Sequence, residues 1–181
     1  MLEPIEEEGI KFKEYAELKD FVEDDSNSTN VHKINFTSGD TFYMNNDYQL
    51  IHQPYHGTAH DEYRFTSSAL KKLFTIIGCG PLYHSMSLES SFGMATSYVN
   101  NILSPKNKYA KKLNGYNFIE KKGTILGFFS QKYTYVKNSE VLNAANGLME
   151  LDNGSNEFNF AEASVVNTRM KLRVNQEYTG F

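Results

Sequence analysis

At 181 residues, the chain is long enough for one domain with a substantial core and too short for two comfortable ones. Its apolar content of 40% fits a globular protein, and its formal charge of −4 gives no reason to expect a nucleic acid as an obligate partner. No apolar run approaches the length of a membrane span, and the acidic N-terminus is unlike a signal peptide, so a cytoplasmic protein without a membrane partner is expected.

The first third of the chain predicts one helix followed by short strands. Residues 1–9 are expected to form a loose acidic arm, and Ile10–Val22 carries apolar residues at helical spacing. A polar loop is predicted over Glu23–Asn30. Three strands are predicted after it: Val31–Phe36, Thr41–Met44 and Tyr48–His52.

Two further helices are predicted in the middle of the chain. The first is capped by Ser67 or Ser68 and runs to Ile77, where glycines and Pro81 end it. Leu82–Ser87 is expected to be a short extended segment. The second helix begins near Ser90 or Ser91 and ends at Ser104.

The remainder predicts strands separated by loops. The apolar run Thr124–Phe129 is typical of a buried strand, and Asn143–Ser155, rich in Asn and Gly, is expected to be a surface loop. Three other strands are predicted: Tyr133–Val136, Ala163–Val166 and Met170–Val174. Short strands with few helices between them indicate an α+β fold with a split or two-sheet core.

The chain contains one cysteine and a small group of lysines that could carry function. Cys79 cannot form an internal disulfide, which favours a reducing compartment, and the apolar residues before it predict a buried thiol rather than a nucleophile. A solvated helix face explains the lysines better than a binding patch does. They are Lys106, Lys108, Lys111 and Lys112.

Three motifs stand out by their order and spacing. Pro54–Thr58 follows a predicted strand and by itself indicates a strand-end turn, although its glycine lets a flat ligand approach the backbone. Leu82–Ser87 contains Tyr and a Ser-x-Ser pair, and the helix after it contains Met94–Tyr98. Glu162 precedes an apolar strand, and Thr168–Val174 forms the strand after that.

Together these motifs resemble those of the mono-ADP-ribosyltransferases, the NAD-consuming fold of diphtheria-like and cholera-like toxins and T-even phage transferases. The resemblance extends from about Gln53 to the C-terminus. It implies an ADP-ribosyltransferase-like split two-sheet β core with flanking helices. We therefore expect an N-terminal arm, helix and short strands over residues 1–47 and a transferase-like domain over residues 48–181, together one compact unit.

The resemblance implies a role for each residue of the catalytic group. Breaking the nicotinamide–ribose bond builds positive charge on the ribose, and a carboxylate beside it stabilises that charge. Glu162 is the expected carboxylate. Tyr83 is expected to stack on the nicotinamide, with Tyr98 as a second candidate, and His56 to hydrogen-bond a ribose hydroxyl.

The cofactor-binding residues are implied in the same way. Gly57 would hold the carboxamide through its backbone, and Thr58 belongs to the same motif. Ser85 or Ser87 would orient Glu162 or the ribose. NAD is expected as a substrate, and no metal is expected.

The resemblance implies an NAD-dependent mono-ADP-ribosyltransferase that modifies a macromolecular acceptor, a protein first of all. Such an enzyme would be an effector, a toxin or a phage host-modifying protein. Arginine-modifying members carry a second Glu where this chain has Phe160, so another acceptor or plain NAD hydrolysis stays open. His56 also belongs to one subfamily and the Ser-x-Ser pair to another.

Two alternatives stay open beside the transferase. Because its motifs come from two subfamilies, the chain could also be a binding or inhibitor protein that keeps the transferase fold but does not turn over NAD. Metal binding is suggested by the even spacing of His52, His56 and His60. Pro54 and Gly57 oppose a helix there, and on a strand such positions lie about 13 Å apart, too far for one ion.

Overall fold

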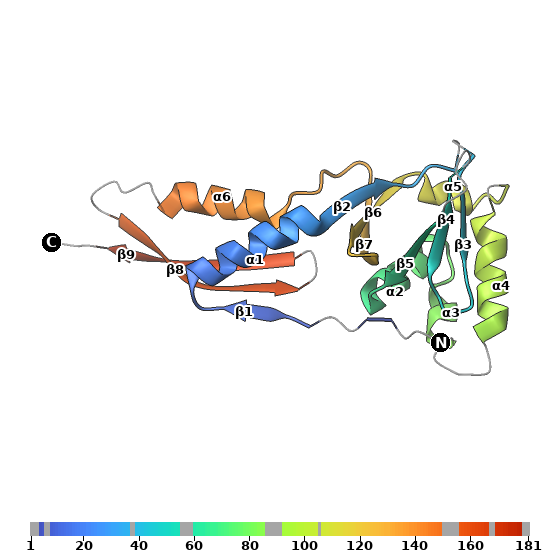
Figure 1. Ribbon diagram of the computed structural model, residues 1–181, viewed down its shortest axis with the longest axis horizontal. Coiled ribbons are helices and arrows are strands. Elements are labelled where there is room, and N and C mark those ends of the chain that lie inside the picture. The colour runs from blue at the N-terminus through green and yellow to red at the C-terminus, as the bar shows by residue number, and fades with distance from the viewer. Residues whose placement is uncertain are drawn as a thin grey trace. The chain divides into compact units, whose positions relative to one another are not determined.

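The computed structural model of the chain describes residues 4–5, 8–36, 39–54, 60–85, 92–104, 106–149, 156–166 and 169–178. These residues form two β-sheets and six helices (Figure 1), which confirms the α+β class. The specific ADP-ribosyltransferase-like arrangement stays a prediction. The chain divides into two compact units. Unit 1 comprises Met1–Glu6 and Asn30–Tyr133, and unit 2 comprises Glu7–Thr29 and Thr134–Phe181.

Unit 1 is built on a six-stranded sheet. In spatial order its strands are β2 (Thr29–Lys33), β6 (Tyr116–Lys121), β7 (Thr124–Ser130), β5 (Asp61–Phe65), β4 (Leu50–Gln53) and β3 (Thr41–Met44). β5 and β7 run parallel, whereas β3–β4, β4–β5 and β6–β7 are antiparallel. β3 and β4 lie on opposite sides of the division expected between residues 47 and 48, yet they pair with each other in this sheet.

Four helices complete unit 1: α2 (Ser67–Ile76), α3 (Gly80–Ser85), α4 (Phe92–Leu103) and α5 (Ala110–Leu113). α2 packs against β7, and α4 packs against the edge strand β3. The Asn100 side chain of α4 accepts from the Met44 backbone N–H at 2.6 Å and donates to the Met44 carbonyl at 2.8 Å. The amide therefore satisfies backbone groups that an edge strand would otherwise expose.

The β6–β7 hairpin turns through Lys122 and Gly123, which have φ values of 50° and 77°. Two consecutive positive φ values are typical of a type I′ turn, and only glycine adopts them without strain. A Cβ added at Gly123 or at Gly127 in β7 would meet no atom within 4 Å. The two glycines therefore differ in backbone conformation and not in available space.

We expect Gly123→Ala to lower the free energy of unfolding by about 1 kcal/mol, because alanine is strained at positive φ. Gly127→Ala is the matched control and should leave stability unchanged or raise it slightly, since a strand residue with a side chain loses less entropy on folding. Urea unfolding followed by circular dichroism measures both. Equal losses in the two variants would contradict the turn assignment.

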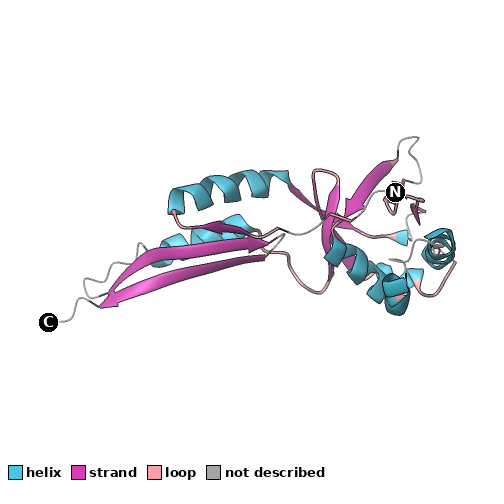
Figure 2. Cartoon of the chain, turned by 90° about the horizontal axis from the view of Figure 1, so that it is seen from below, coloured by secondary structure: helices cyan, strands magenta, loops and turns pink. Residues whose placement is uncertain are grey.

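Unit 2 pairs a three-stranded antiparallel sheet with two helices. The strands lie in the order β1 (Ile10–Phe12), β8 (Asn156–Val166) and β9 (Arg169–Tyr178). α1 (Tyr15–Ser28) and α6 (Asn138–Met149) pack against each other and against β8, and both helices cover one face of the sheet (Figures 1 and 2). Leu18, Val22 and Val165 are among the buried residues of the core between them.

The predicted helix over Ile10–Val22 is wrong at its start, and the loop after it is wrong. Ile10–Phe12 is a strand because it pairs with β8, with Ile10 opposite Val165. The helix instead begins at Tyr15 and continues through the polar run to Ser28. One of those polar residues, Asp25, is buried and accepts a hydrogen bond from Asn138 Nδ2 at 3.1 Å. This polar residue therefore contributes to the packing of α1 against α6.

The extended segment predicted over Leu82–Ser87 is wrong where the structure describes it, because Gly80–Ser85 is the helix α3. Pro81 is the second residue of α3. Proline is tolerated in the first helical turn, where its missing N–H would have no partner within the helix. A residue expected to end one helix therefore lies in the first turn of the next.

Two other local predictions are wrong where the structure describes them. The surface loop predicted over Asn143–Ser155 is a helix as far as Met149, because α6 runs to that residue with Leu142 and Ala145 buried at a helical spacing. Residues 150–155 lie outside the described part of the chain. Tyr133–Val136 forms no strand, and the Tyr133 side chain is 72% exposed. The predicted strands Thr41–Met44 and Thr124–Phe129 are confirmed as β3 and as part of β7.

Candidate functional site

Four of the predicted site residues lie outside the described part of the chain: His56, Gly57, Thr58 and Ser87. Ser85 is the last residue of α3, and its side chain is likewise outside the description. The predicted roles of these five residues stay predictions. Three predicted residues can be placed with their side chains: Tyr83, Tyr98 and Glu162.

Tyr83 lies on helix α3 rather than on a strand. Its ring makes an edge contact with Phe74, with centroids 6.0 Å apart and planes at 63°, and Phe74 is fully buried. The Tyr83 hydroxyl donates a hydrogen bond to the Ser67 carbonyl at 3.4 Å. These contacts tie α3 to α2, and the Tyr83 side chain is half-buried against the core of unit 1.

Tyr98 lies on helix α4 of unit 1, and its side chain is 55% exposed. It is one of the large apolar side chains that the described surface presents to solvent. Val99, the next residue, is fully buried, which is the pattern of a helix with one buried face. Tyr98 is therefore accessible to a ligand.

Glu162 belongs to unit 2, whereas Tyr83 and Tyr98 belong to unit 1. The expectation that Glu162 precedes the strand is wrong, because β8 begins at Asn156 and Glu162 lies inside it. The ladder with β9 shifts register between Phe160 and Glu162, as at a β-bulge. The Glu162 side chain is 60% exposed, and its Oε1 lies 3.5 Å from Nη1 of Arg173, directly opposite on β9.

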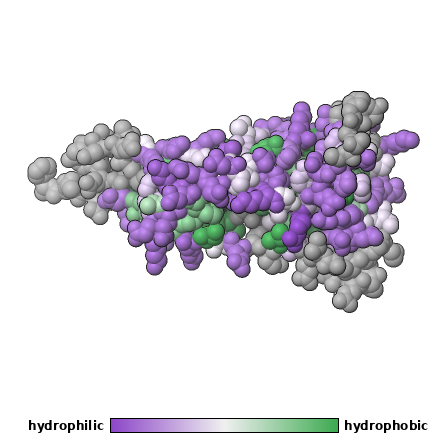
Figure 3. Space-filling view, in the orientation of Figure 1, coloured by the Kyte–Doolittle hydropathy of each residue, from purple (hydrophilic) through white to green (hydrophobic). Residues whose placement is uncertain are grey.

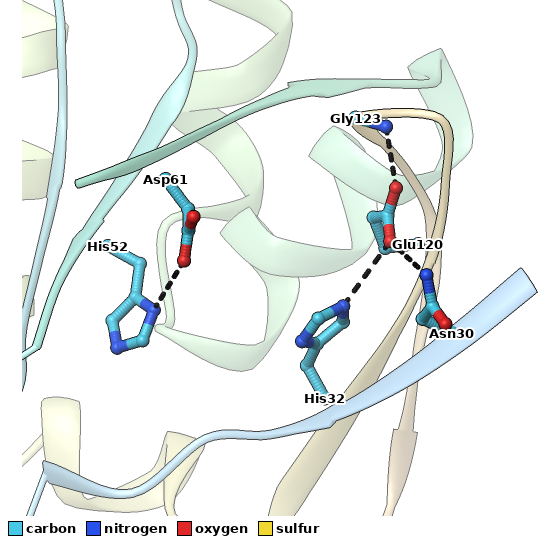
Figure 4. A network of polar contacts seen from close by, with 6 residues as sticks. All are labelled: Asn30, His32, His52, Asp61, Glu120 and Gly123. Carbon is cyan, nitrogen blue, oxygen red and sulfur yellow. Dashed lines mark hydrogen bonds and ion pairs between the residues drawn. The ribbon is translucent and has the colours of Figure 1, made fainter. Parts of the chain in front are cut away.

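A polar network that the sequence did not suggest lies on the six-stranded sheet of unit 1 (Figure 4). Its centre is Glu120 of β6, a carboxylate residue that is only 7% exposed. Glu120 accepts hydrogen bonds from the Gly123 backbone N–H at 2.5 Å and from Asn30 Nδ2 at 3.0 Å. Nε2 of His32 lies 3.3 Å from the same carboxylate. We call these four residues the Glu120 network.

The donors around Glu120 control its ionisation. Burial by itself raises the pKa of the carboxyl group, but the hydrogen bonds from Asn30, Gly123 and His32 outweigh burial and lower the pKa below its ordinary value. Glu120 is therefore held as a carboxylate. Because it caps the β6–β7 turn and contacts two residues of β2, it joins three strands of the sheet.

The His32 ring is held through one face and through one of its ring nitrogens. It stacks on Phe118, with centroids 4.8 Å apart and planes at 14°, while Glu120 contacts Nε2. The His32 side chain is 36% exposed. A carboxylate that orients a partly exposed histidine is an arrangement that suits proton transfer.

A second histidine on the sheet has similar surroundings. His52 of β4 stacks on Phe42, with centroids 4.6 Å apart and planes at 9°. Its Nδ1 lies 3.6 Å from Asp61 and its Nε2 lies 3.5 Å from Asp40 (Figure 4 shows the contact with Asp61). Each of these two histidines is thus placed between an aromatic ring and at least one carboxylate.

Tyr63 of β5 lies near members of both histidine–carboxylate groups. Burial, the charges of Asp61 and Glu120, and a hydrogen bond with Asp61 raise the pKa of Tyr63 to about 12. Its ring centroid is 5.2 Å from that of Phe118 and 5.7 Å from that of His32. The phenol therefore stays protonated at neutral pH and can donate a hydrogen bond.

No local feature of the sequence predicts this arrangement. His32 and Glu120 are separated by 88 residues, and no spacing rule connects them. The only function that the sequence suggests for His52 is metal binding. Within the described residues, no group of three or more His, Cys, Asp or Glu side chains could hold a metal ion, and His60 instead contacts Glu62 at 3.1 Å.

Cys79 is 4% exposed, which confirms the predicted buried thiol. Its surroundings are apolar residues of the unit 1 core, and burial raises the pKa of the thiol. A raised pKa reduces the fraction of thiolate, the reactive form. A structural role follows from both observations.

No protein-family model, no curated protein and no solved structure matches the chain. None of the described helices combines the length and the apolar character that crossing a bilayer requires. In the view of Figure 3, hydrophilic residues cover most of the described surface, with smaller hydrophobic areas between them.

Proposed function

We propose that the protein acts by binding a partner and does not turn over NAD. The observation that carries this proposal is the position of Tyr83, the ring expected to stack on nicotinamide. Its hydroxyl is directed to the Ser67 carbonyl, and its ring packs against Phe74. A ring used in this way stabilises the packing of α2 and α3 and has less free surface for a flat ligand.

The surroundings of Glu162 also support binding without turnover. A carboxylate that stabilises a developing cation works best where water is excluded and the group is held in place. The Glu162 side chain is 60% exposed and lies beside the Arg173 guanidinium, which offsets its negative charge. Solvent and this cation would both weaken its effect on a ribosyl cation.

The second candidate is the mono-ADP-ribosyltransferase that the sequence motifs predict, with NAD as substrate and a macromolecular acceptor. What favours it is the order of the three motifs together with the accessibility of Glu162, whose carboxylate a ligand could reach. The same experiment distinguishes the two candidates.

The test is incubation of the purified protein with NAD labelled in its adenylate group, with and without a cell lysate. We expect no release of nicotinamide, which would appear as labelled free ADP-ribose, and no labelled protein or nucleic acid. Release that Glu162→Gln abolishes while the circular dichroism spectrum is unchanged would overturn the binding proposal and support the transferase. Glu140→Gln, at an exposed carboxylate of α6 in the same unit, is the matched control.

A further inference from the structure

The two sides of strand β9 differ sharply in chemistry. Arg169, Lys171 and Arg173 are exposed, whereas Met170 and Leu172 between them are half-buried against the core of unit 2. Successive residues of a strand point to opposite faces of the sheet. The three cations therefore share the face that α1 and α6 do not cover, and neighbouring cations are about 7 Å apart along the strand.

A fourth cation joins this face from the other end of the chain. The strand register places Lys11 of β1 opposite Ser164 of β8, and Ser164 opposite Lys171 of β9. The three residues thus form one row across the sheet, with the two lysines about 10 Å apart and the serine between them. Lys11 is exposed. We call Lys11, Ser164, Arg169, Lys171 and Arg173 the basic sheet face.

The charge on this face is opposite to that of the chain as a whole. Among the side chains that the structure describes on this face, four are cations and one, Glu162, is a carboxylate, whereas the chain as a whole carries a formal charge of −4. The run of cations ends beyond Arg173, where the register pairs Asn159 with Asn175 and then Glu157 with Glu177. Negative charge in unit 2 instead gathers on α1, the helix on the other side of the sheet. Its exposed acidic residues are Glu17, Asp20, Glu23 and Asp24.

We infer that the basic sheet face binds the phosphate backbone of a single-stranded nucleic acid. The inference rests on the proposed binding function and names its surface and its partner. Arginine matches a phosphate with two parallel hydrogen bonds, lysine adds a point charge, and a serine hydroxyl is a common phosphate ligand. A straight row of cations about 7 Å apart suits consecutive phosphates of an extended strand.

A single strand fits this face better than a duplex or a lipid surface does. The cations lie on a sheet face and follow one line, and the described part of this face presents no helix that could enter a major groove. Amphipathic segments that bind a membrane surface stably combine cations with apolar side chains that enter the lipid. In the described part of this sheet the exposed large apolar residue is Ile10, and it alternates with Lys11 and so lies on the opposite side.

The test is the binding of a fluorescently labelled oligo(dT) of about 20 nucleotides to the full chain, measured by anisotropy at low salt. The triple variant Arg169→Gln, Lys171→Gln, Arg173→Gln should bind at least tenfold more weakly than the wild type. The matched control, Lys108→Gln, Lys111→Gln, Lys112→Gln, removes the same charge from unit 1 and should change the affinity less than twofold.

Two further measurements separate a specific surface from misfolding. Three phosphate contacts predict a slope of about −2 in log K against log salt, which the triple variant should lose. Glu162→Gln removes the carboxylate beside Arg173 and should strengthen binding about twofold to threefold by removing like-charge repulsion. A variant that gains affinity cannot owe its effect to unfolding.

Three outcomes would overturn the inference: no measurable oligo(dT) binding by the wild type, an equal loss in the matched control, or preferential binding to phosphatidylserine vesicles that the triple variant loses. None of these involves release of nicotinamide from NAD. Failure of this inference can therefore be told apart from failure of the proposed binding function, which NAD consumption would overturn.

Discussion

Phe74→Ala is expected to lower the free energy of unfolding by about 3–5 kcal/mol, because it removes a large side chain from the centre of unit 1. Phe74 is fully buried, and it contacts Tyr83, which ties α3 to α2. The space left behind cannot be filled without moving these helices. Urea unfolding followed by circular dichroism measures the loss.

The matched control is Tyr133→Ala, which removes an aromatic ring of similar size from the same unit. Tyr133 is 72% exposed, so its replacement should change stability by less than about 0.5 kcal/mol. A Phe74→Ala variant as stable as Tyr133→Ala would show that the core of unit 1 is not packed around α2 as described.

Glu120→Gln is expected to lower the free energy of unfolding by about 2–3 kcal/mol at neutral pH. Glu120 accepts from Asn30 and Gly123 and contacts His32, and hydrogen bonds to a charged acceptor are the stronger kind. A glutamine keeps one acceptor oxygen but turns an amide N–H group toward groups that donate. Glu62→Gln, at an exposed carboxylate of the same unit, should have little effect.

The pH dependence of the free energy of unfolding provides a second test of the Glu120 network. Because the folded-state pKa of Glu120 lies below the ordinary value of 4.5, its stabilising effect is complete above pH 4.5. The effect is lost as the pH falls through the folded-state pKa, where the carboxylate becomes protonated in both states. The stability difference between wild type and Glu120→Gln should therefore shrink at acid pH, and a constant difference would contradict the assignment.

Helix α2 shows where local sequence was sufficient. The apolar residues Leu70, Leu73 and Phe74 recur at helical spacing, and all three are buried. Only the cap differs, since Thr66 rather than Ser67 or Ser68 accepts the hydrogen bond from the Ala69 N–H at 3.3 Å. Such a helix is predictable because the helical spacing of its apolar residues lies within one short segment, and the apolar stripe that they form packs against the core.

Strands β1 and β6 show where local sequence was insufficient. Ile10–Phe12 is too short to be a strand by itself and becomes one by pairing with β8. Local sequence does not predict β6, because polar and apolar residues do not alternate regularly along it. In the structure its ladder with β7 shifts register between Ile119 and Glu120. In both cases a partner strand far away in sequence determines the conformation.

The same distinction applies to the candidate sites. Local sequence predicts an extended segment at Tyr83, because Pro81 normally ends a helix, whereas Pro81 lies in the first turn of α3. The Glu120 network joins residues from β2, β6 and the β6–β7 turn. The basic sheet face joins Lys11 to residues more than 150 positions away.

The sequence by itself determined the α+β class, the buried thiol of Cys79, the helix α2 and the strands that form β3 and the core of β7. These follow from periodicity and burial within short segments. Tertiary structure alone decided which charges share a face, because strand pairing and register bring distant residues together. The alternating cations of β9 form a candidate binding surface because strand pairing brings Lys11 to the same face of the sheet. The helices α1 and α6 cover the other face and leave this one open.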